Sequence, residues 1–69
     1  MKLIVNGESH DWKPAPDAPW LQPLLEHLGV GARKVAVVVN EEVVPANQWA
    51  AFVIHEGDRV EILTYAGGG

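Results

Sequence analysis

Residues 2–5 predict a strand, in which Leu3 and Val5 lie on one side. The pair Asn6-Gly7 follows directly. This pair suits a type I′ turn, because both central residues of such a turn need a positive φ. We therefore expect a β-hairpin at the start of the chain, with a return strand over residues 8–12.

Leucines at helical spacing follow a loop, residues 13–19, that contains three prolines. The apolar stripe has the spacing i, i+3, i+4 and i+7 and consists of Leu21, Leu24, Leu25 and Leu28. Pro23 lacks a backbone donor and is harmless only in the first turn, so the helix is expected to begin at Trp20 or Leu21. Gly29 is expected to end it, since glycine readily adopts the left-handed conformation beyond a helix.

The second half of the chain alternates strands and turns. Residues 35–39 are almost wholly β-branched, which predicts a strand in the middle of the sheet, covered on both faces or nearly so. The turn at Asn40-Glu41 leads into a short strand over residues 42–44. A helical turn is expected over residues 46–51, and a last strand over residues 59–65.

This order of elements predicts an α+β fold, in which one helix packs across a sheet of four to five strands and no helix covers the opposite face. Residues 1–69 are expected to form a single domain, because a chain of 69 residues supports one hydrophobic core. The composition, 48% hydrophobic and 20% charged, is that of a folded protein. We expect Trp49 in the core, whereas Trp12 and Trp20 are open to two interpretations, core residues or a lid over one sheet edge.

The charge and the lack of cysteine disfavour several classes of function. Nine acidic and five basic residues give a formal charge of −4, which disfavours nucleic-acid binding. The chain has no cysteine, so no thiol chemistry or thiolate-bound metal is expected. Its longest apolar run is far shorter than the about 20 residues of a membrane span, and its start does not resemble a signal peptide. We expect a cytoplasmic protein that binds no membrane.

The chain ends in Ala66, Gly67, Gly68 and Gly69, directly after the last predicted strand. Glycines make a narrow tail that passes through a tight channel, and the only reactive group there is the carboxylate of Gly69. Activation of a carboxylate as an acyl-adenylate needs ATP, Mg²⁺ and charge-stabilising groups, which a separate enzyme would have to supply. From the residues alone, a functional tail and a frayed end without chemistry are equally plausible.

Several segments together resemble the ThiS family, the ubiquitin-like sulfur carriers of thiamine biosynthesis. The segments that carry the resemblance are the helix end at 24–29, the strand at 35–39, the segment 40–45, Trp49, the segment 57–62 and the glycines 67–69. The likeness covers the whole chain. Ala46 and Glu41 depart from the family pattern, in which arginine and glycine are common at these positions, but neither lies in the tail.

The resemblance implies a β-grasp fold and a mechanism. A ThiF-like adenylyltransferase would attach AMP to Gly69, using ATP and Mg²⁺, and sulfur from a cysteine desulfurase would convert the carboxylate to a thiocarboxylate. Thiazole synthase (ThiG) would receive that sulfur. Residues 66–68 would thread into the partners' active sites. The chain would therefore be a carrier rather than an enzyme, and would bind no cofactor or metal itself.

Three other functions remain as alternatives. They are a small subunit of molybdopterin synthase, a sulfur carrier for tRNA thiolation, and a ubiquitin-like interaction module with no chemistry at its tail. The stretch before the final glycines lacks the prolines that are usual in the molybdopterin synthase subunit, which favours the thiamine pathway.

A docking patch is expected on the sheet face that no helix covers. In a regular last strand Leu63 and Tyr65 point to this face, and Ile4 does the same in the first strand. Exposed apolar residues that gather in one place indicate a partner surface, and the alternative is that they are scattered. The three histidines share no metal-ligand spacing, and the carboxylates of the predicted turns are expected to be solvated.

Overall fold

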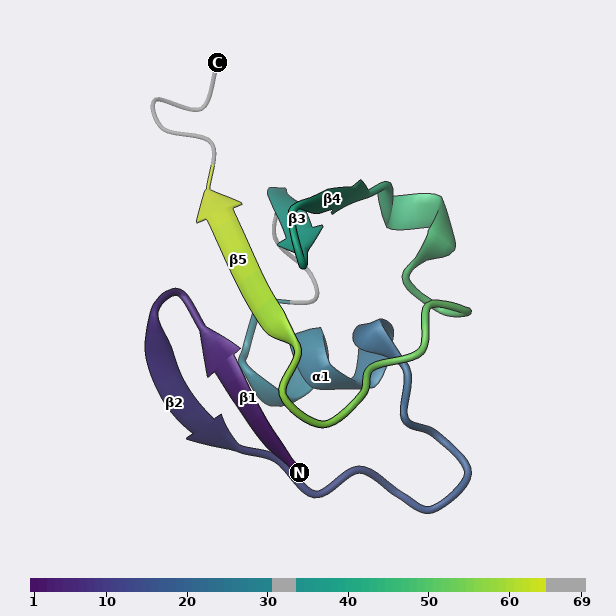
Figure 1. Cartoon of the computed structure of the whole chain (residues 1–69). Helices are drawn as coiled ribbons and strands as arrows, with labels where there is room; N and C mark the ends of the chain where they lie inside the picture. Colours follow the sequence, from purple (N-terminus) through teal and green to yellow (C-terminus); the bar gives the residue numbers. More distant parts are fainter. Residues whose placement is uncertain (31–33, 65–69) are drawn as a thin grey trace.

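The computed structural model describes residues 1–30 and 34–64 and contains five strands, one α-helix and one short 3₁₀ helix (Figure 1). In chain order these are β1 (Lys2–Val5), β2 (Glu8–Asp11), α1 (Leu21–His27), β3 (Val35–Val39), β4 (Glu42–Val44), the 3₁₀ helix (Ala46–Gln48) and β5 (Arg59–Thr64). The elements predicted from the sequence are therefore all present. The tail residues Ala66, Gly67, Gly68 and Gly69, together with Tyr65, lie outside the described residues.

The strands form one sheet in the order β2-β1-β5-β3-β4. β5 is the middle strand, parallel to β1 and antiparallel to β3, and the other two pairs are the antiparallel hairpins β1–β2 and β3–β4. The last strand of the chain thus joins two hairpins that are far apart in the sequence. This mixed sheet confirms the predicted α+β class.

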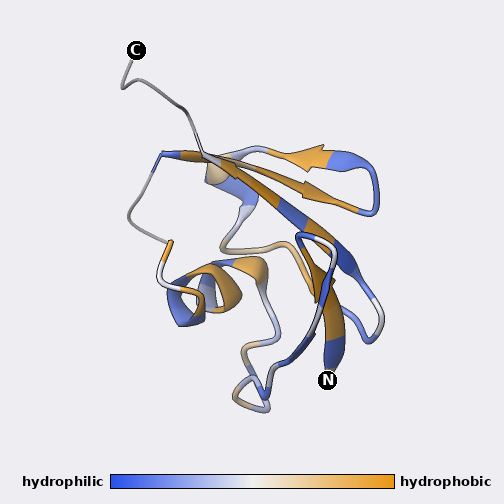
Figure 2. Ribbon diagram, turned by 90° about the vertical axis from the view of Figure 1, so that its left-hand side faces the viewer, coloured by the Kyte–Doolittle hydropathy of each residue, from blue (hydrophilic) through white to orange (hydrophobic). Residues whose placement is uncertain are grey.

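The hydrophobic core lies between α1 and one face of the sheet (Figure 2). The largest fully buried side chains are Leu3, Leu21, Leu24, Leu25, Val37, Ile54 and Val60. Trp49 is buried as predicted, and its indole N–H donates to the backbone oxygen of Val44 at 2.9 Å. Trp12 also belongs to the core, whereas Trp20 is half-buried and forms an isolated bridge with Val53.

Gly29 ends α1 as predicted. Its φ is 79°, and its N–H donates to the oxygen of Glu26 at 3.0 Å. The N–H of Val30 donates to the oxygen of Leu25, also at 3.0 Å, and Val30 packs against the core. These two hydrogen bonds form a Schellman motif, which satisfies carbonyl groups that would otherwise have no partner at the helix end.

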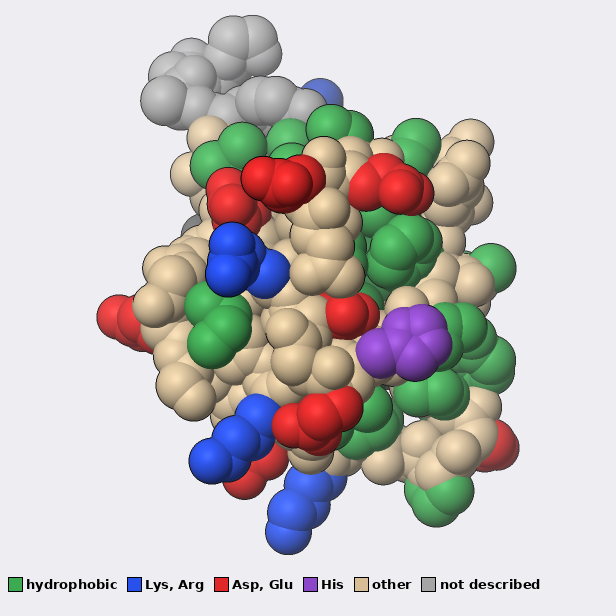
Figure 3. All heavy atoms as spheres, viewed as in Figure 1, with side chains coloured by type: hydrophobic (Ala, Val, Ile, Leu, Met, Phe, Trp, Pro, Cys, Tyr) green, Lys and Arg blue, Asp and Glu red, His purple; other side chains and the backbone are tan. Residues whose placement is uncertain are grey.

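The prediction for β3 is wrong in one respect, because this strand is covered on one face only. Val35, Val37 and Val39 are buried, but Ala36 and Val38 are only partly so. β3 does lie inside the sheet, between β5 and the edge strand β4. The physical reason is that α1 covers a single face of the sheet, and the face turned to the viewer in Figures 1 and 3 carries no helix.

Both hairpin turns have the backbone that the sequence predicts. Asn6 and Gly7 have φ of 50° and 82°, and Asn40 and Glu41 have φ of 50° and 70°. Glycine adopts this conformation freely, but a side chain with a Cβ is strained there. Glu41 therefore lowers the stability of the β3–β4 hairpin.

Replacement of Glu41 by glycine is expected to raise the free energy of unfolding by about 0.5–1 kcal/mol, because it relieves this strain. Glu42→Gly is the matched control, since it removes the same charge from a residue in an extended strand, where glycine destabilises. Urea titration monitored by tryptophan fluorescence measures both variants. A Glu41→Gly variant as unstable as Glu42→Gly would contradict the expectation.

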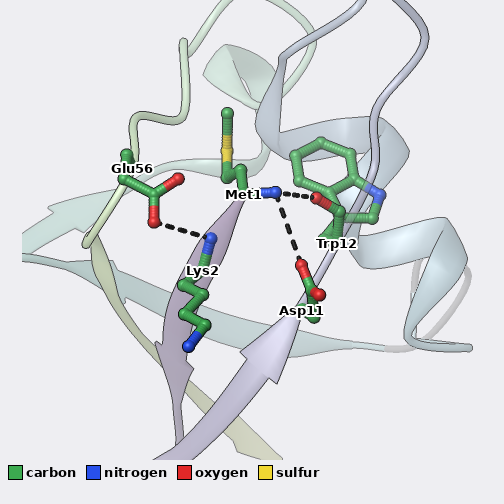
Figure 4. A network of polar contacts seen from close by, with 5 residues as sticks. All are labelled: Met1, Lys2, Asp11, Trp12 and Glu56. Carbon is green, nitrogen blue, oxygen red and sulfur yellow. Dashed lines mark hydrogen bonds and ion pairs between the residues drawn. The ribbon is translucent and has the colours of Figure 1, made fainter.

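A network of polar contacts holds the first residues of the chain in place (Figure 4). The amino group of Met1 donates to the backbone oxygen of Trp12 at 2.7 Å and lies 3.5 Å from a carboxylate oxygen of Asp11. The N–H of Lys2 donates to the carboxylate of Glu56 at 2.9 Å. The start of β1 is therefore tied both to the end of β2 and to the turn before β5.

Candidate functional site

The candidate site is the end of β5, which leads into the tail. β5 is described up to Thr64, so the chain covers only five more residues to Gly69. Val60, in the middle of the sheet, is completely buried. The carrier residue predicted from the sequence thus follows the middle strand of the sheet.

Two asparagines in the hairpin turns fix β5 from both sides. On one side, Asn6 donates its N–H to the oxygen of Val60 at 2.9 Å and accepts the N–H of Ile62 on its Oδ1 at 2.7 Å. On the other side, Asn40 donates its N–H to the oxygen of Arg59 at 2.8 Å and accepts the N–H of Arg59 on its Oδ1 at 2.9 Å. The Asn-Gly signal predicted the first turn but not these side-chain contacts.

Asp58 is a buried carboxylate at the base of β5, with an exposed fraction of 9%. It accepts the side-chain N–H of Asn40 at 3.0 Å and the backbone N–H of His55 at 2.8 Å. The expectation that the carboxylates of this turn are solvated is therefore wrong for Asp58. No local pattern indicates this role, because Asn40 lies 18 residues away along the chain.

Replacement of Asp58 by alanine is expected to lower the free energy of unfolding by about 1–3 kcal/mol, because Asn40 and His55 each lose an acceptor in a partly buried place. Asp17→Ala is the control, since Asp17 is exposed in the proline-rich loop. Its effect should stay within about 0.5 kcal/mol. Circular dichroism measures the melting temperatures of both variants. Equal melting temperatures would contradict the role of Asp58.

Ile4 and Leu63, two residues of the predicted docking patch, lie on the same helix-free face of the sheet. Their side chains are not neighbours, because Ile4 is opposite Arg59, and Leu63 lies four residues, about 13 Å, further along β5. The third residue, Tyr65, lies outside the described residues. On this face Leu63 lies next to β3 instead, and β3 and β4 carry further apolar residues that the prediction omitted.

These omitted residues are Ala36, Val38 and Val43. Ala36 is opposite Leu63, and Val38 is opposite Val43. The exposed fractions of Val43 and Leu63 are 67% and 54%, the two largest among the large hydrophobic side chains described. In Figure 3 hydrophobic side chains gather along the upper part of this face, with acidic side chains beside them.

A hollow on the same face is lined by Ile4, Asn6, Gly7, Arg59 and Glu61. A second one is lined by Asn40, Glu41, Gly57 and Arg59, so that Arg59 borders both. Each lining contains one carboxylate, that of Glu61 or that of Glu41, but no hydroxyl, thiol or imidazole group that could be paired with it.

The histidines do not form a metal site within the described residues. The structure does bring His10 and His27 together, with ring centroids 5.8 Å apart in an edge-to-face arrangement between β2 and α1. His55 is exposed and lies in the turn before β5. No helix among the described residues is both long and apolar enough to cross a bilayer.

Comparison with known proteins assigns the chain to a family. Residues 3–69 match the ThiS family. The chain belongs to the ThiS family. A crystal structure of the thiamine biosynthesis protein ThiS from Geobacter metallireducens superposes on this ThiS-family chain with a TM-score of 0.82 and 36% identity, over the full length of both. The five-stranded mixed sheet with its single helix is thus a β-grasp fold.

Curated relatives of this ThiS-family chain are of two sizes. The sulfur carrier protein ThiS of Escherichia coli is 33% identical over 46 residues, which are 67% of this chain and 70% of that protein. Two proteins named thiazole synthase, from Paramagnetospirillum magneticum and Magnetococcus marinus, are 41% and 39% identical over the whole chain. The chain spans only 20% of the length of each thiazole synthase.

Proposed function

We propose that this ThiS-family chain is a sulfur carrier of thiamine biosynthesis, with Gly69 as the residue that carries the sulfur. The observation that supports this most is that the family match extends through residue 69 and includes the three terminal glycines. The name of the Escherichia coli relative, a sulfur carrier protein, points the same way.

The chemistry would take place on the carboxylate of Gly69 in two steps. In the first, a ThiF-like adenylyltransferase joins the carboxylate to the α-phosphate of ATP, and pyrophosphate leaves. In the second, hydrosulfide attacks the acyl carbon and AMP leaves, so that one carboxylate oxygen is replaced by sulfur. The cysteine desulfurase is the indirect source of that sulfur, because a thiol reductant must release it as hydrosulfide from the persulfide of the desulfurase. ATP and Mg²⁺ belong to the partner.

Thiazole synthase is the proposed acceptor of this sulfur. Two proteins of that name contain a region similar to the whole of this chain, together with about four times its length of further sequence. A carrier domain and an enzyme that are joined in one polypeptide in some organisms are expected to work together when they are separate. The proposed place of action is the cytoplasm.

Incubation of the chain with a ThiF-like adenylyltransferase, Mg²⁺-ATP and sulfide tests this function. The intact mass should rise by about 16 Da, the difference between sulfur and oxygen, and AMP should appear in equal amount. A reaction with α,β-methylene-ATP is the control and should leave the mass unchanged, because adenylation must break the bond between the α- and β-phosphates. A chain that never gains this mass, under conditions that load the Escherichia coli carrier, is not a sulfur carrier.

A further inference from the structure

Asn6 and Gly7 form the turn between β1 and β2, and both residues are exposed. Val5 and Glu8 are the last pair of this hairpin ladder, so the N–H of Gly7 lies beyond the ladder and has no backbone acceptor among the described residues. A methyl group on the Cα of Gly7 would have no neighbour within 4 Å. The backbone nitrogen that follows Asn6 is therefore unbound and uncrowded.

The side-chain amide of Asn6 is bound at its oxygen but not at its nitrogen. Oδ1 accepts the N–H of Ile62 at 2.7 Å, and within residues 1–30 and 34–64 no hydrogen bond involves Nδ2. A donor on the oxygen stabilises the negative charge that develops there when a nucleophile adds to the adjacent carbon, Cγ. The contact with β5 thus makes Cγ more electrophilic and leaves the amino group able to depart.

Asn40 has the matching position in the other hairpin turn and the same φ of 50°. Its Oδ1 accepts the N–H of Arg59 at 2.9 Å, so the oxygen is bound in the same way, but its Nδ2 donates to Asp58 at 3.0 Å. The residue after it is Glu41, whose side chain crowds the approach of the backbone nitrogen to Cγ. Asn40 is therefore an internal control for Asn6.

We infer that Asn6 is a site of spontaneous deamidation. The backbone nitrogen of Gly7 attacks Cγ of Asn6, the bond between Cγ and Nδ2 breaks, and ammonia leaves with the proton of the Gly7 amide. Water then opens the succinimide ring that has formed. Hydrolysis of the bond between the ring nitrogen and Cγ gives aspartate. Hydrolysis of the bond between this nitrogen and the backbone carbonyl carbon gives isoaspartate, in which the main chain runs through Cγ.

Deamidation changes a turn that holds β5 in place. Both products add a negative charge at the hollow that Asn6 lines together with Glu61 and Arg59. In the isoaspartate form, Oδ1 becomes a main-chain oxygen and the turn gains one backbone carbon, which a two-residue turn of defined geometry does not accommodate. The hydrogen bond from Ile62 is therefore expected to be lost, so that β5 keeps the side-chain contact of Asn40 but not that of Asn6.

Incubation of the folded chain in mildly alkaline buffer, followed by tryptic peptide mapping, tests this site. The peptide 3–33 contains Asn6, and the peptide 35–59 contains the other two asparagines, Asn40 and Asn47. A gain of about 1 Da, the difference between a hydroxyl and an amino group, should appear on Asn6 at least tenfold faster than on either of these. Asn47 is an exposed residue of the 3₁₀ helix. Endoproteinase Asp-N separates the two products, because it cleaves before aspartate but not before isoaspartate.

Gly7→Ala is the matched variant, since it keeps Asn6 and adds only a Cβ beside the attacking nitrogen. It is expected to slow deamidation of Asn6 at least fivefold. Circular dichroism checks that the variant is folded. The isoaspartate form of the parent, separated by ion exchange, should unfold at a lower urea concentration than the unmodified chain.

Three results would overturn the inference. One is an equal rate of deamidation at the three asparagines of the folded chain. Another is an Asn6 that reacts in urea but stays intact in the folded chain over the same time, because the turn would then protect the amide. The third is a folded Gly7→Ala variant that loses this amide as fast as the parent. An isoaspartate form as stable as the unmodified chain would contradict the expected effect on β5.

Discussion

Deletion of Gly69 is expected to slow the gain of sulfur mass at least about 100-fold, because a displacement of about 1 Å of the reacting group already costs this much. The shortened chain still ends in a glycine carboxylate, but this carboxylate stops one residue, about 3.5 Å, short of the reacting phosphate. The variant and the parent thus carry the same chemical group at the C-terminus. The variant therefore tests whether an adenylyltransferase that binds the folded domain requires a tail of full length.

The measurement is the release of pyrophosphate, followed by intact mass. Gly69→Ala complements the deletion, because it keeps the length and adds only a Cβ, which tests whether the channel excludes a methyl group. Both variants should melt at the temperature of the parent. If the shortened chain were adenylated at the rate of the parent, the position of Gly69 would have no role in the reaction.

Leu24→Ala is expected to lower the free energy of unfolding by about 2–5 kcal/mol, the range for buried leucines. Leu24 is completely buried in the middle of α1, the helix that covers one face of the sheet. A single core in a chain of this size rarely supplies more than about 3–5 kcal/mol in total. A large part of the variant is therefore expected to be unfolded at 37 °C.

Glu26→Ala is the control for this substitution, since Glu26 is an exposed residue of the same helix and alanine favours a helix. Urea titration and one-dimensional proton NMR separate the two outcomes. Well-dispersed methyl signals in Leu24→Ala, together with a stability close to that of the parent, would mean that α1 contributes less than its burial indicates.

The local parts of the fold were predictable because their signals lie within a few residues of one another. The leucine stripe with Gly29 determined α1, and the Asn6-Gly7 and Asn40-Glu41 pairs determined the hairpins. The family resemblance added the β-grasp arrangement. A parallel pair between β1 and β5 leaves no comparable signal, because the two strands are more than 50 residues apart.

The candidate site was predictable only in part, for the same reason. The direction of Leu63 follows from alternation along one strand, but the valines that lie beside it depend on the register between strands. The burial of Asp58 depends on Asn40, which the sequence places in another turn. Contacts of this kind are fixed by tertiary structure, and periodicity along the chain does not report them.

Because β5 is both the middle strand and the last one in the sequence, a growing polypeptide holds two unconnected hairpins until residues 59–64 have emerged. Isolated hairpins are marginally stable at best in water. A chain interrupted before this point would expose the flanks of β1 and β3, which are prone to aggregation and proteolysis. The sheet is therefore completed just before the segment that leads to Gly69, so that products truncated before residue 59 do not present the folded domain.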